Sequence, residues 1–274
     1  MDRLAVGDVM RDRIFIVLMI MACIVGFYRL ELLQPNSVSD VAADGSSATD
    51  SALPDFDAFN DVKAKKAAFF DFMLPLILEE NARVAEQRLQ LVALSSHLDA
   101  LTGKQQQWLV ELAQEYRIVA SHNKAKVLSE KWLIEELLLR VDQVPPSLAL
   151  AQAANESAWG TSRFAEKGNN LYGQWCFKKG CGLVPNRRVD GARHEVAKFE
   201  SPRHSVQRYI YNLNTNFAYT EFRKWRAEQR SKQEPLSGEL AAMTLTRYSV
   251  RGAEYVDELQ AMIRVNDLQQ YDTI

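Results

Sequence analysis

The chain has too few cysteines and too little excess charge for several specialised classes of protein. It holds three cysteines in 274 residues, which excludes a small scaffold held together by disulfide bonds. Lysine and arginine total 33 against 35 aspartates and glutamates, so no excess of positive charge indicates nucleic-acid binding. Charged residues make up 25% and hydrophobic residues 47%, which is an ordinary globular composition. This length allows one large domain or two small ones.

Long uncharged runs are also scarce, and the one near the N-terminus, residues 14–28, therefore stands out. It is shorter than the roughly 20 residues of a comfortable membrane span. Because arginines precede it, we interpret residues 1–30 as a secretory signal peptide or an uncleaved signal anchor. No clear cleavage site follows, which favours an anchor. A lipoprotein processing site at Cys23 is the weaker alternative.

The next segment, residues 31–55, lacks any lysine and is rich in serine, aspartate and alanine. Its central part, residues 34–55, contains no aromatic residue and cannot bury enough apolar surface to fold alone. We therefore predict a flexible acidic linker. A linker that follows an export signal would place the rest of the chain outside the cytoplasm.

Residues 56–128 contain only two residues that strongly disfavour a helix, Pro75 and Gly103. Apolar side chains recur there at helical spacing, for example at Phe69 and Met73. The pattern predicts an all-helical segment whose aromatic residues form core. Binding of a partner protein is an alternative role for this segment.

A later stretch, residues 148–160, is rich in alanine and leucine and contains one acid, Glu156. Ser147 could cap its first turn, and Gly160 could end it in the left-handed conformation. Glu156 then lies in the last turn of a buried helix, where the helix dipole and apolar neighbours raise a carboxyl pKa. A carboxyl kept protonated near neutral pH can act as a general acid. The alternative is a glutamate that simply reaches water.

Four motifs occur in order from that helix onward. They are Glu-Ser-Ala-Trp-Gly at 156–160, Gly-Asn-Asn-Leu-Tyr-Gly at 168–173, Phe-Glu-Ser-Pro-Arg-His-Ser-Val-Gln-Arg-Tyr at 199–209 and Tyr-Ser-Val-Arg-Gly-Ala-Glu-Tyr at 248–255. Together they resemble the bacterial β-N-acetylglucosaminidase family, glycoside hydrolase family 73, which cuts peptidoglycan. The resemblance begins near residue 144 and reaches the C-terminus.

The resemblance implies an α+β, predominantly helical fold: a lysozyme-like domain with a small β-hairpin lobe, at residues 129–274, preceded by the helical segment. It implies hydrolysis of the β-1,4 bond after N-acetylglucosamine in peptidoglycan, with Glu156 as general acid and no metal or cofactor. The expected partners are peptidoglycan glycan strands and, through residues 14–28, the inner membrane, with no nucleic acid. The expected location is the periplasm.

The same resemblance suggests further site residues. Tyr255 is expected to face the cleft, although a tyrosine of the core is the alternative. Family members carry a second acid on the β-lobe, and Glu195 is the candidate here, but neither it nor Asp190 falls where the family residue is expected. A solvated hairpin charge is the alternative for both. Substrate contacts are expected from four more residues: Asn170, Tyr172, Trp159 and Tyr248.

Cys176 and Cys181 are separated by four residues. In an exported protein this spacing suits a small loop closed by a disulfide. Zinc binding is an alternative, with His194 or His204 as further ligands, but the spacing matches no standard zinc signature. We therefore predict a disulfide and no metal.

Two other functions remain open on the same motifs. A lytic transglycosylase uses one glutamate on this fold and releases an anhydro sugar. A cell-wall-binding protein without turnover would need no second acid or tyrosine near Glu156.

Overall fold

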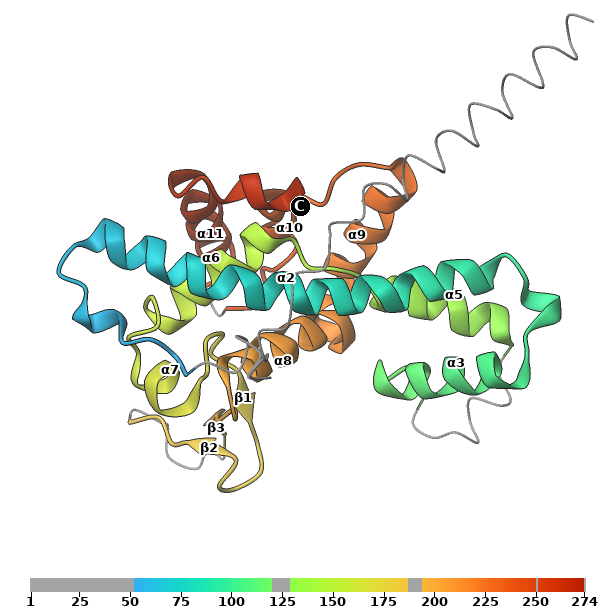
Figure 1. Ribbon diagram of the computed structural model, residues 1–274, viewed down its shortest axis with the longest axis horizontal. Helices are drawn as coiled ribbons and strands as arrows, with labels where there is room; N and C mark the ends of the chain where they lie inside the picture. The colour runs from blue at the N-terminus through green and yellow to red at the C-terminus, as the bar shows by residue number, and fades with distance from the viewer. Residues whose placement is uncertain (1–51, 120–128, 187–193, 250, 274) are drawn as a thin grey trace, which may run out of the picture. The chain divides into compact units, whose positions relative to one another are not determined.

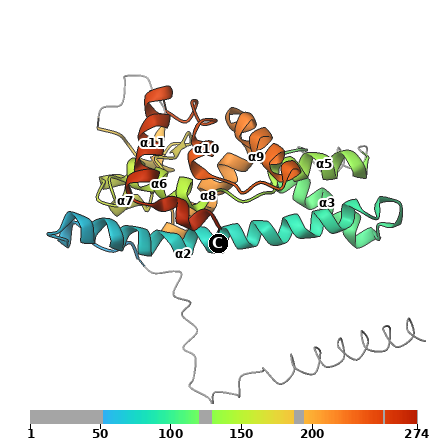
Figure 2. The same cartoon turned by 90° about the horizontal axis from the view of Figure 1, so that it is seen from above.

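The longest element is α2 (Val62–Ser95), which begins where the Asp61 side chain accepts a hydrogen bond from the Ala64 backbone N–H at 2.7 Å. The computed structural model describes residues 52–119, 129–186, 194–249 and 251–273. Pro75 lies inside α2 without ending it. Figures 1 and 2 show α2 running along one side of the other helices. Its buried side chains include the apolar residues whose spacing predicted a helix.

α5 (Glu130–Arg140) packs beside the C-terminal half of α2, and α3 (Gly103–Glu115) packs against α5. Thr102 and Gln105 cap the start of α3 reciprocally, which satisfies backbone donors of its first turn. A short 3₁₀ turn, η1 (Phe56–Ala58), precedes α2, and another, η2 (Leu98–Ala100), precedes α3. The described part of the predicted helical segment is therefore helical, as its pattern indicated.

The alanine-rich stretch forms α6 (Pro146–Ser157), which α2 covers on one side and α10, α11 and η4 on others. The helix ends earlier than the sequence suggested. Ala158 already has φ of 51°, and Trp159 and Gly160 continue in the left-handed region. At Gly160 an added Cβ would lie 2.5 Å from the Phe56 ring, so only glycine fits there. Ser147 is not the cap either, since its hydroxyl donates to Asp272 at 2.7 Å.

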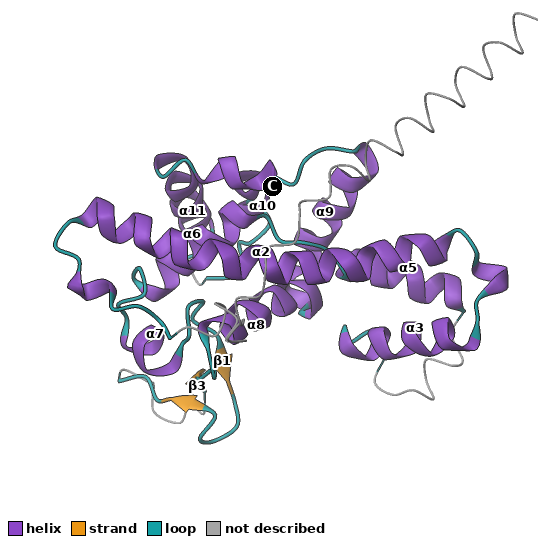
Figure 3. Ribbon diagram, in the orientation of Figure 1, coloured by secondary structure: helices purple, strands orange, loops and turns teal. Residues whose placement is uncertain are grey.

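After α7 (Arg163–Gly168) the chain forms three short strands: β1 (Trp175–Cys176), β2 (Gly182–Leu183) and β3 (Glu195–Ala197). Their order in the described part is β1-β3-β2, and both pairs are antiparallel. Figure 3 shows these strands in one small lobe among predominantly helical elements. The expected turn at Asp190 lies outside the described residues.

The remaining described elements are helical. They are α8 (Pro202–Thr215), η3 (Phe217–Tyr219), α9 (Thr220–Lys232), α10 (Gly238–Ala242), α11 (Ala253–Val265) and η4 (Leu268–Thr273). The fold is thus α+β and predominantly helical with a small antiparallel sheet, which confirms the predicted fold class.

The helices on either side of residue 128 share one hydrophobic core. Phe69 and Phe70 of α2 are buried together with Leu148 of α6 and Leu259 of α11. The helical segment and the motif-bearing segment therefore stabilise each other by packing. In the described residues no helix combines the length and apolar character needed to cross a membrane. The apolar run at 14–28 lies outside the described residues.

Candidate active site

A cleft of about 660 Å³ opens beside the last turn of α6. Its walls come from the loop after α7, from β1, from α8 and η3, from the turn before α11 and from the end of α3. The lining residues include Glu156, Tyr172, Trp175, Phe177, Tyr219 and Tyr248. Segments far apart in the sequence thus meet around one acid.

Glu156 is the only carboxylate among the described residues that line this cleft. Its burial raises the pKa of the carboxyl above the ordinary value, because the charged form is poorly solvated there. A hydrogen bond from Tyr255 and the positive charge of Arg251 act in the opposite direction, and the nearby Glu258 adds to the increase. The net increase favours the protonated form that a general acid requires.

A chain of hydrogen bonds between buried side chains ends at the Glu156 carboxyl. The Tyr209 hydroxyl donates to Gln152 Oε1 at 2.6 Å, and Gln152 Nε2 donates to the Tyr255 hydroxyl at 2.9 Å. Because that hydroxyl accepts from Gln152, its own proton is directed to Glu156, with which it is hydrogen-bonded. Burial also raises the pKa of Tyr255, so the phenol stays protonated and remains a donor.

The tyrosine rings are themselves held by stacking. Tyr248 lies parallel to Tyr255 with ring centres 5.7 Å apart, and its hydroxyl donates to the Tyr172 carbonyl oxygen at 3.0 Å. Tyr172 in turn stacks on Tyr209 at 3.8 Å. Such contacts each contribute about 0.5–1.5 kcal/mol beyond burial. The two tyrosines of the last motif meet through a turn, not through helical spacing, since α11 begins only at Ala253.

Two residues expected to bind substrate do not line the cleft. The Asn170 side chain is buried and is occupied by backbone groups: it donates to the Gln174 and Ala197 carbonyl oxygens and accepts from the Gln174 N–H. It holds the loop in place. Trp159 packs edge-on against Phe69 and Phe70 of α2, because its left-handed backbone turns the ring toward that helix. Tyr172 and Tyr248, by contrast, do line the cleft. Tyr255, which was expected to face the cleft, is fully buried and does not line it, because its ring packs in the core against Tyr248.

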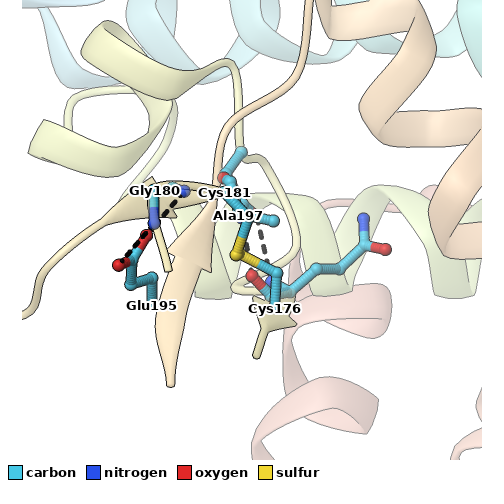
Figure 4. The surroundings of a disulfide bond; sticks show 8 residues. Cys176, Gly180, Cys181, Glu195 and Ala197 are labelled. Carbon is cyan, nitrogen blue, oxygen red and sulfur yellow. Dashed lines mark hydrogen bonds between the residues drawn. A yellow bond between two sulfur atoms is a disulfide. The ribbon is translucent and has the colours of Figure 1, made fainter. Parts of the chain in front are cut away.

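Glu195, the candidate second acid, is buried in the β-lobe and does not line the cleft. Its Oε1 accepts from the Gly180 N–H at 3.0 Å and its Oε2 from the Gly182 N–H at 2.9 Å, as Figure 4 shows for Gly180. At Gly182 a Cβ would lie 2.0 Å from the Val196 carbonyl oxygen, so only glycine fits. These contacts give Glu195 a structural role in closing the loop.

Cys176 and Cys181 form a disulfide that closes the same loop. Trp175 directly precedes this loop and Phe177 lies within it; the two residues are 59% and 74% exposed and line the cleft. Large apolar side chains left exposed in a cleft indicate a binding surface. The Trp175 ring also stacks on His194 with ring centres 4.2 Å apart.

The motifs did not point to Gln152 or Tyr209 as parts of the site. Gln152 lies four residues before Glu156 on one helix, so their side chains share a face, and this spacing was a usable signal. Tyr209 lies within the third motif, but its bond to Gln152 depends on how α8 packs and could not be read from the sequence.

Comparison with known proteins identifies the family of the chain. The family model described as "Mannosyl-glycoprotein endo-beta-N-acetylglucosaminidase" matches residues 134–268. The chain belongs to the glucosaminidase family. The chain is 34% identical over 221 residues to "Protein bax" of Escherichia coli K12, covering 81% of the chain and 77% of that protein.

The chain is also 26% identical over 167 residues to "Exo-glucosaminidase LytG" of Bacillus subtilis, covering 59% of the chain and 54% of that protein. No solved structure matches. Family membership supports glycosidase chemistry on peptidoglycan, and the matched region contains the whole tyrosine chain and Glu156.

Proposed function

We propose that the chain hydrolyses the β-1,4 bond after N-acetylglucosamine in peptidoglycan, with Glu156 as the general acid. The observation that carries the proposal is the buried Glu156 carboxyl, with its raised pKa and its hydrogen bond from Tyr255, in a cleft large enough for several sugar rings. The family match supports the substrate class.

In this proposal the glycosidic oxygen takes the proton of Glu156 as the bond to the sugar C1 breaks. Because Glu156 is the only acid among the described lining residues, the substrate's own N-acetyl oxygen attacks C1 from the opposite face. Water then opens the cyclic intermediate, and the Glu156 carboxylate takes a proton from that water. Tyr255 directs its hydroxyl proton to the carboxylate and stabilises the charge that develops there.

Trp175 and Phe177 are proposed to hold the strand by packing against the apolar faces of sugar rings. Both are exposed in the cleft, Phe177 within the loop that the disulfide closes and Trp175 directly before its first cysteine. A short disulfide loop contributes little chain entropy, so its effect is to fix these two rings.

A lytic transglycosylase is the second candidate, because a cleft with one described carboxylate also suits an enzyme that needs only one acid. The two reactions differ in their products. Digestion of purified peptidoglycan followed by mass spectrometry would show reducing-end sugars with one added water for a hydrolase and anhydro sugars for a transglycosylase. Products that end in N-acetylglucosamine identify the bond proposed here.

A wall-binding protein without turnover would sediment with insoluble peptidoglycan and release no products in that digest. We further propose that residues 1–30 export the chain and anchor it, with residues 31–55 as a tether, so that it acts in the periplasm. Cell fractionation with N-terminal sequencing of the mature protein tests this proposal, and recovery in the cytoplasmic fraction would contradict it.

A further inference from the structure

Two arginines lie against one tyrosine ring on the wall of the cleft. The guanidinium carbon of Arg208 is 4.9 Å from the centre of the Tyr211 ring, and that of Arg117 is 5.1 Å from it. Arg208 and Tyr211 are three residues apart on α8, whereas Arg117 follows α3. The Tyr211 hydroxyl donates to the Glu115 carbonyl oxygen at 2.8 Å, which fixes the ring between the two elements.

The end of α3 is tied firmly to α8. Arg140 donates through Nη1 to the Tyr116 carbonyl oxygen at 3.0 Å and to the Thr215 carbonyl oxygen at 3.2 Å. Arg117 itself has φ of 57°, a strained backbone conformation for a non-glycine residue that persists where the surroundings impose it. The N-terminal helices therefore deliver a positive charge to the cleft in a defined position.

Arg117 and Arg208 are both exposed. Neither has a carboxylate within ion-pairing distance among the described residues. The neighbouring Arg83 differs, since it is paired with Glu80 at 2.8 Å and with Glu115 at 3.7 Å. Arg117 and Arg208 line the same cleft as Glu156. Among the described residues that line this cleft, Glu156 is the only carboxylate. Two positive charges on one ring that lines the cleft both attract an anion bound there.

We propose that Arg117 and Arg208 form a subsite for a carboxylate carried on the glycan strand, and that this subsite makes the enzyme prefer charged strands to neutral ones. The inference rests on the proposed function for its substrate class. Guanidinium groups bind carboxylates through paired N–H donors, and stacking on Tyr211 orients both forks. The carboxylate has two possible sources with the same chemistry: the peptide stem, or the lactyl group of a strand that has lost its stem.

Binding is tested in a Glu156→Gln background, so that no ligand is cleaved. Calorimetry gives Kd for three soluble oligosaccharides of equal length: one with peptide stems, one with lactyl groups only, and a neutral oligomer of N-acetylglucosamine. The variants are Arg117→Gln, Arg208→Gln and the pair together. Arg264→Gln, which removes the same charge from a surface ion pair with Glu239 that does not line the cleft, is the matched control.

We expect the charged ligands to bind at least about tenfold more tightly than the neutral one, and the double variant to lose that preference while its affinity for the neutral ligand is unchanged. Loss of affinity for the lactyl ligand alone identifies the lactyl carboxylate, because a peptide stem converts that carboxylate into an amide. Loss for the stem-bearing ligand alone identifies the stem, and loss for both shows that the subsite accepts either carboxylate. An unchanged preference in the double variant, or an equal loss for all three ligands, would overturn the proposal. Because no turnover is measured, failure of the hydrolysis proposal is detected separately, by the digest described above.

Discussion

The Gln152 amide donates to the Tyr255 hydroxyl at 2.9 Å, and this bond decides where the Tyr255 proton goes. A phenol that accepts from an amide has its single proton free for another acceptor, which here is the Glu156 carboxylate. Gln152 is buried and its Oε1 is already held by Tyr209, so the amide has one orientation that satisfies both ends. The geometry of the proposed acid therefore depends on residues that never reach the cleft.

Glu156→Gln keeps the shape of the side chain and removes its transferable proton. General acid catalysis contributes on the order of 10²–10⁴ in rate, so we expect peptidoglycan cleavage to fall at least about a hundredfold. Clearing of a peptidoglycan suspension measures the activity, and circular dichroism confirms that the fold is retained. Cleavage at the wild-type rate by this variant would remove Glu156 from the mechanism.

The raised pKa of Glu156 also makes stability depend on pH. The folded protein holds this proton more tightly than the unfolded chain, so the favourable contribution is complete below the unfolded pKa and is lost as pH rises through the folded pKa. We expect the difference in melting temperature between Glu156→Gln and wild type to move in favour of the variant from acidic to neutral pH. The rate of peptidoglycan cleavage should also fall as the pH rises through the pKa of Glu156 in the folded protein. A constant difference in melting temperature would mean that the carboxyl pKa is not raised.

Tyr255→Phe removes only the hydroxyl between Gln152 and Glu156. We expect turnover to fall at least about tenfold, roughly 1.4 kcal/mol of barrier, because the hydroxyl stabilises the carboxylate that forms after proton transfer. Stability should fall by about 1–3 kcal/mol, since the buried Gln152 amide loses its acceptor. Tyr116→Phe is the control: it also removes the hydroxyl of a buried ring, but that hydroxyl donates to Gln87, whereas the Tyr255 hydroxyl is bonded to Glu156. Equal turnover in the two variants would assign Tyr255 to the core.

Glu195→Gln distinguishes a catalytic acid from a structural one. Both carboxylate oxygens accept backbone N–H bonds, and the glutamine amide nitrogen would meet an N–H donor in place of an acceptor. The geometry predicts a loss of stability of about 1–3 kcal/mol with turnover within about threefold of wild type. Kinetics should be measured well below the melting temperature. A hundredfold loss of turnover in a folded variant would instead support Glu195 as the second acid.

The disulfide between Cys176 and Cys181 should form in protein made in an oxidising compartment. Intact mass after alkylation, with and without reductant, should show two additional alkylated thiols only after reduction. The Cys176→Ser, Cys181→Ser double variant should raise KM by loosening Trp175 and Phe177, while kcat changes little because Glu156 is held by other elements. Two free thiols in the exported form would contradict the pairing.

Several features of the fold follow from local sequence rules. The alanine-rich helix with Glu156 in its last turn, the helical character of α2 and α3, and the cap at Thr102 depend on short-range propensity and hydrogen bonding. The close spacing of Cys176 and Cys181 in the sequence also predicted their disulfide. Motif order was enough to indicate the family, because four patterns in the right succession are far more specific than any one.

Other features were decided only when distant segments packed together. Asn170 and Trp159 belong to motifs, yet backbone acceptors occupy the first and the aromatic rings of α2 cover the second. Glu195 was the candidate second acid from the sequence, but both of its carboxylate oxygens accept hydrogen bonds from glycine N–H groups.

The sequence by itself determined that a buried helix would carry an acid at its end, because helix propensity and dipole act over a few residues. Only the tertiary structure decided which groups surround that acid. Gln152 of α6 bonds Tyr255, and Tyr209 of α8 bonds Gln152. Arg117 reaches the cleft from the turn after α3. These contacts join residues that are up to about 100 positions apart. Such contacts depend on how helices pack, which no local pattern encodes.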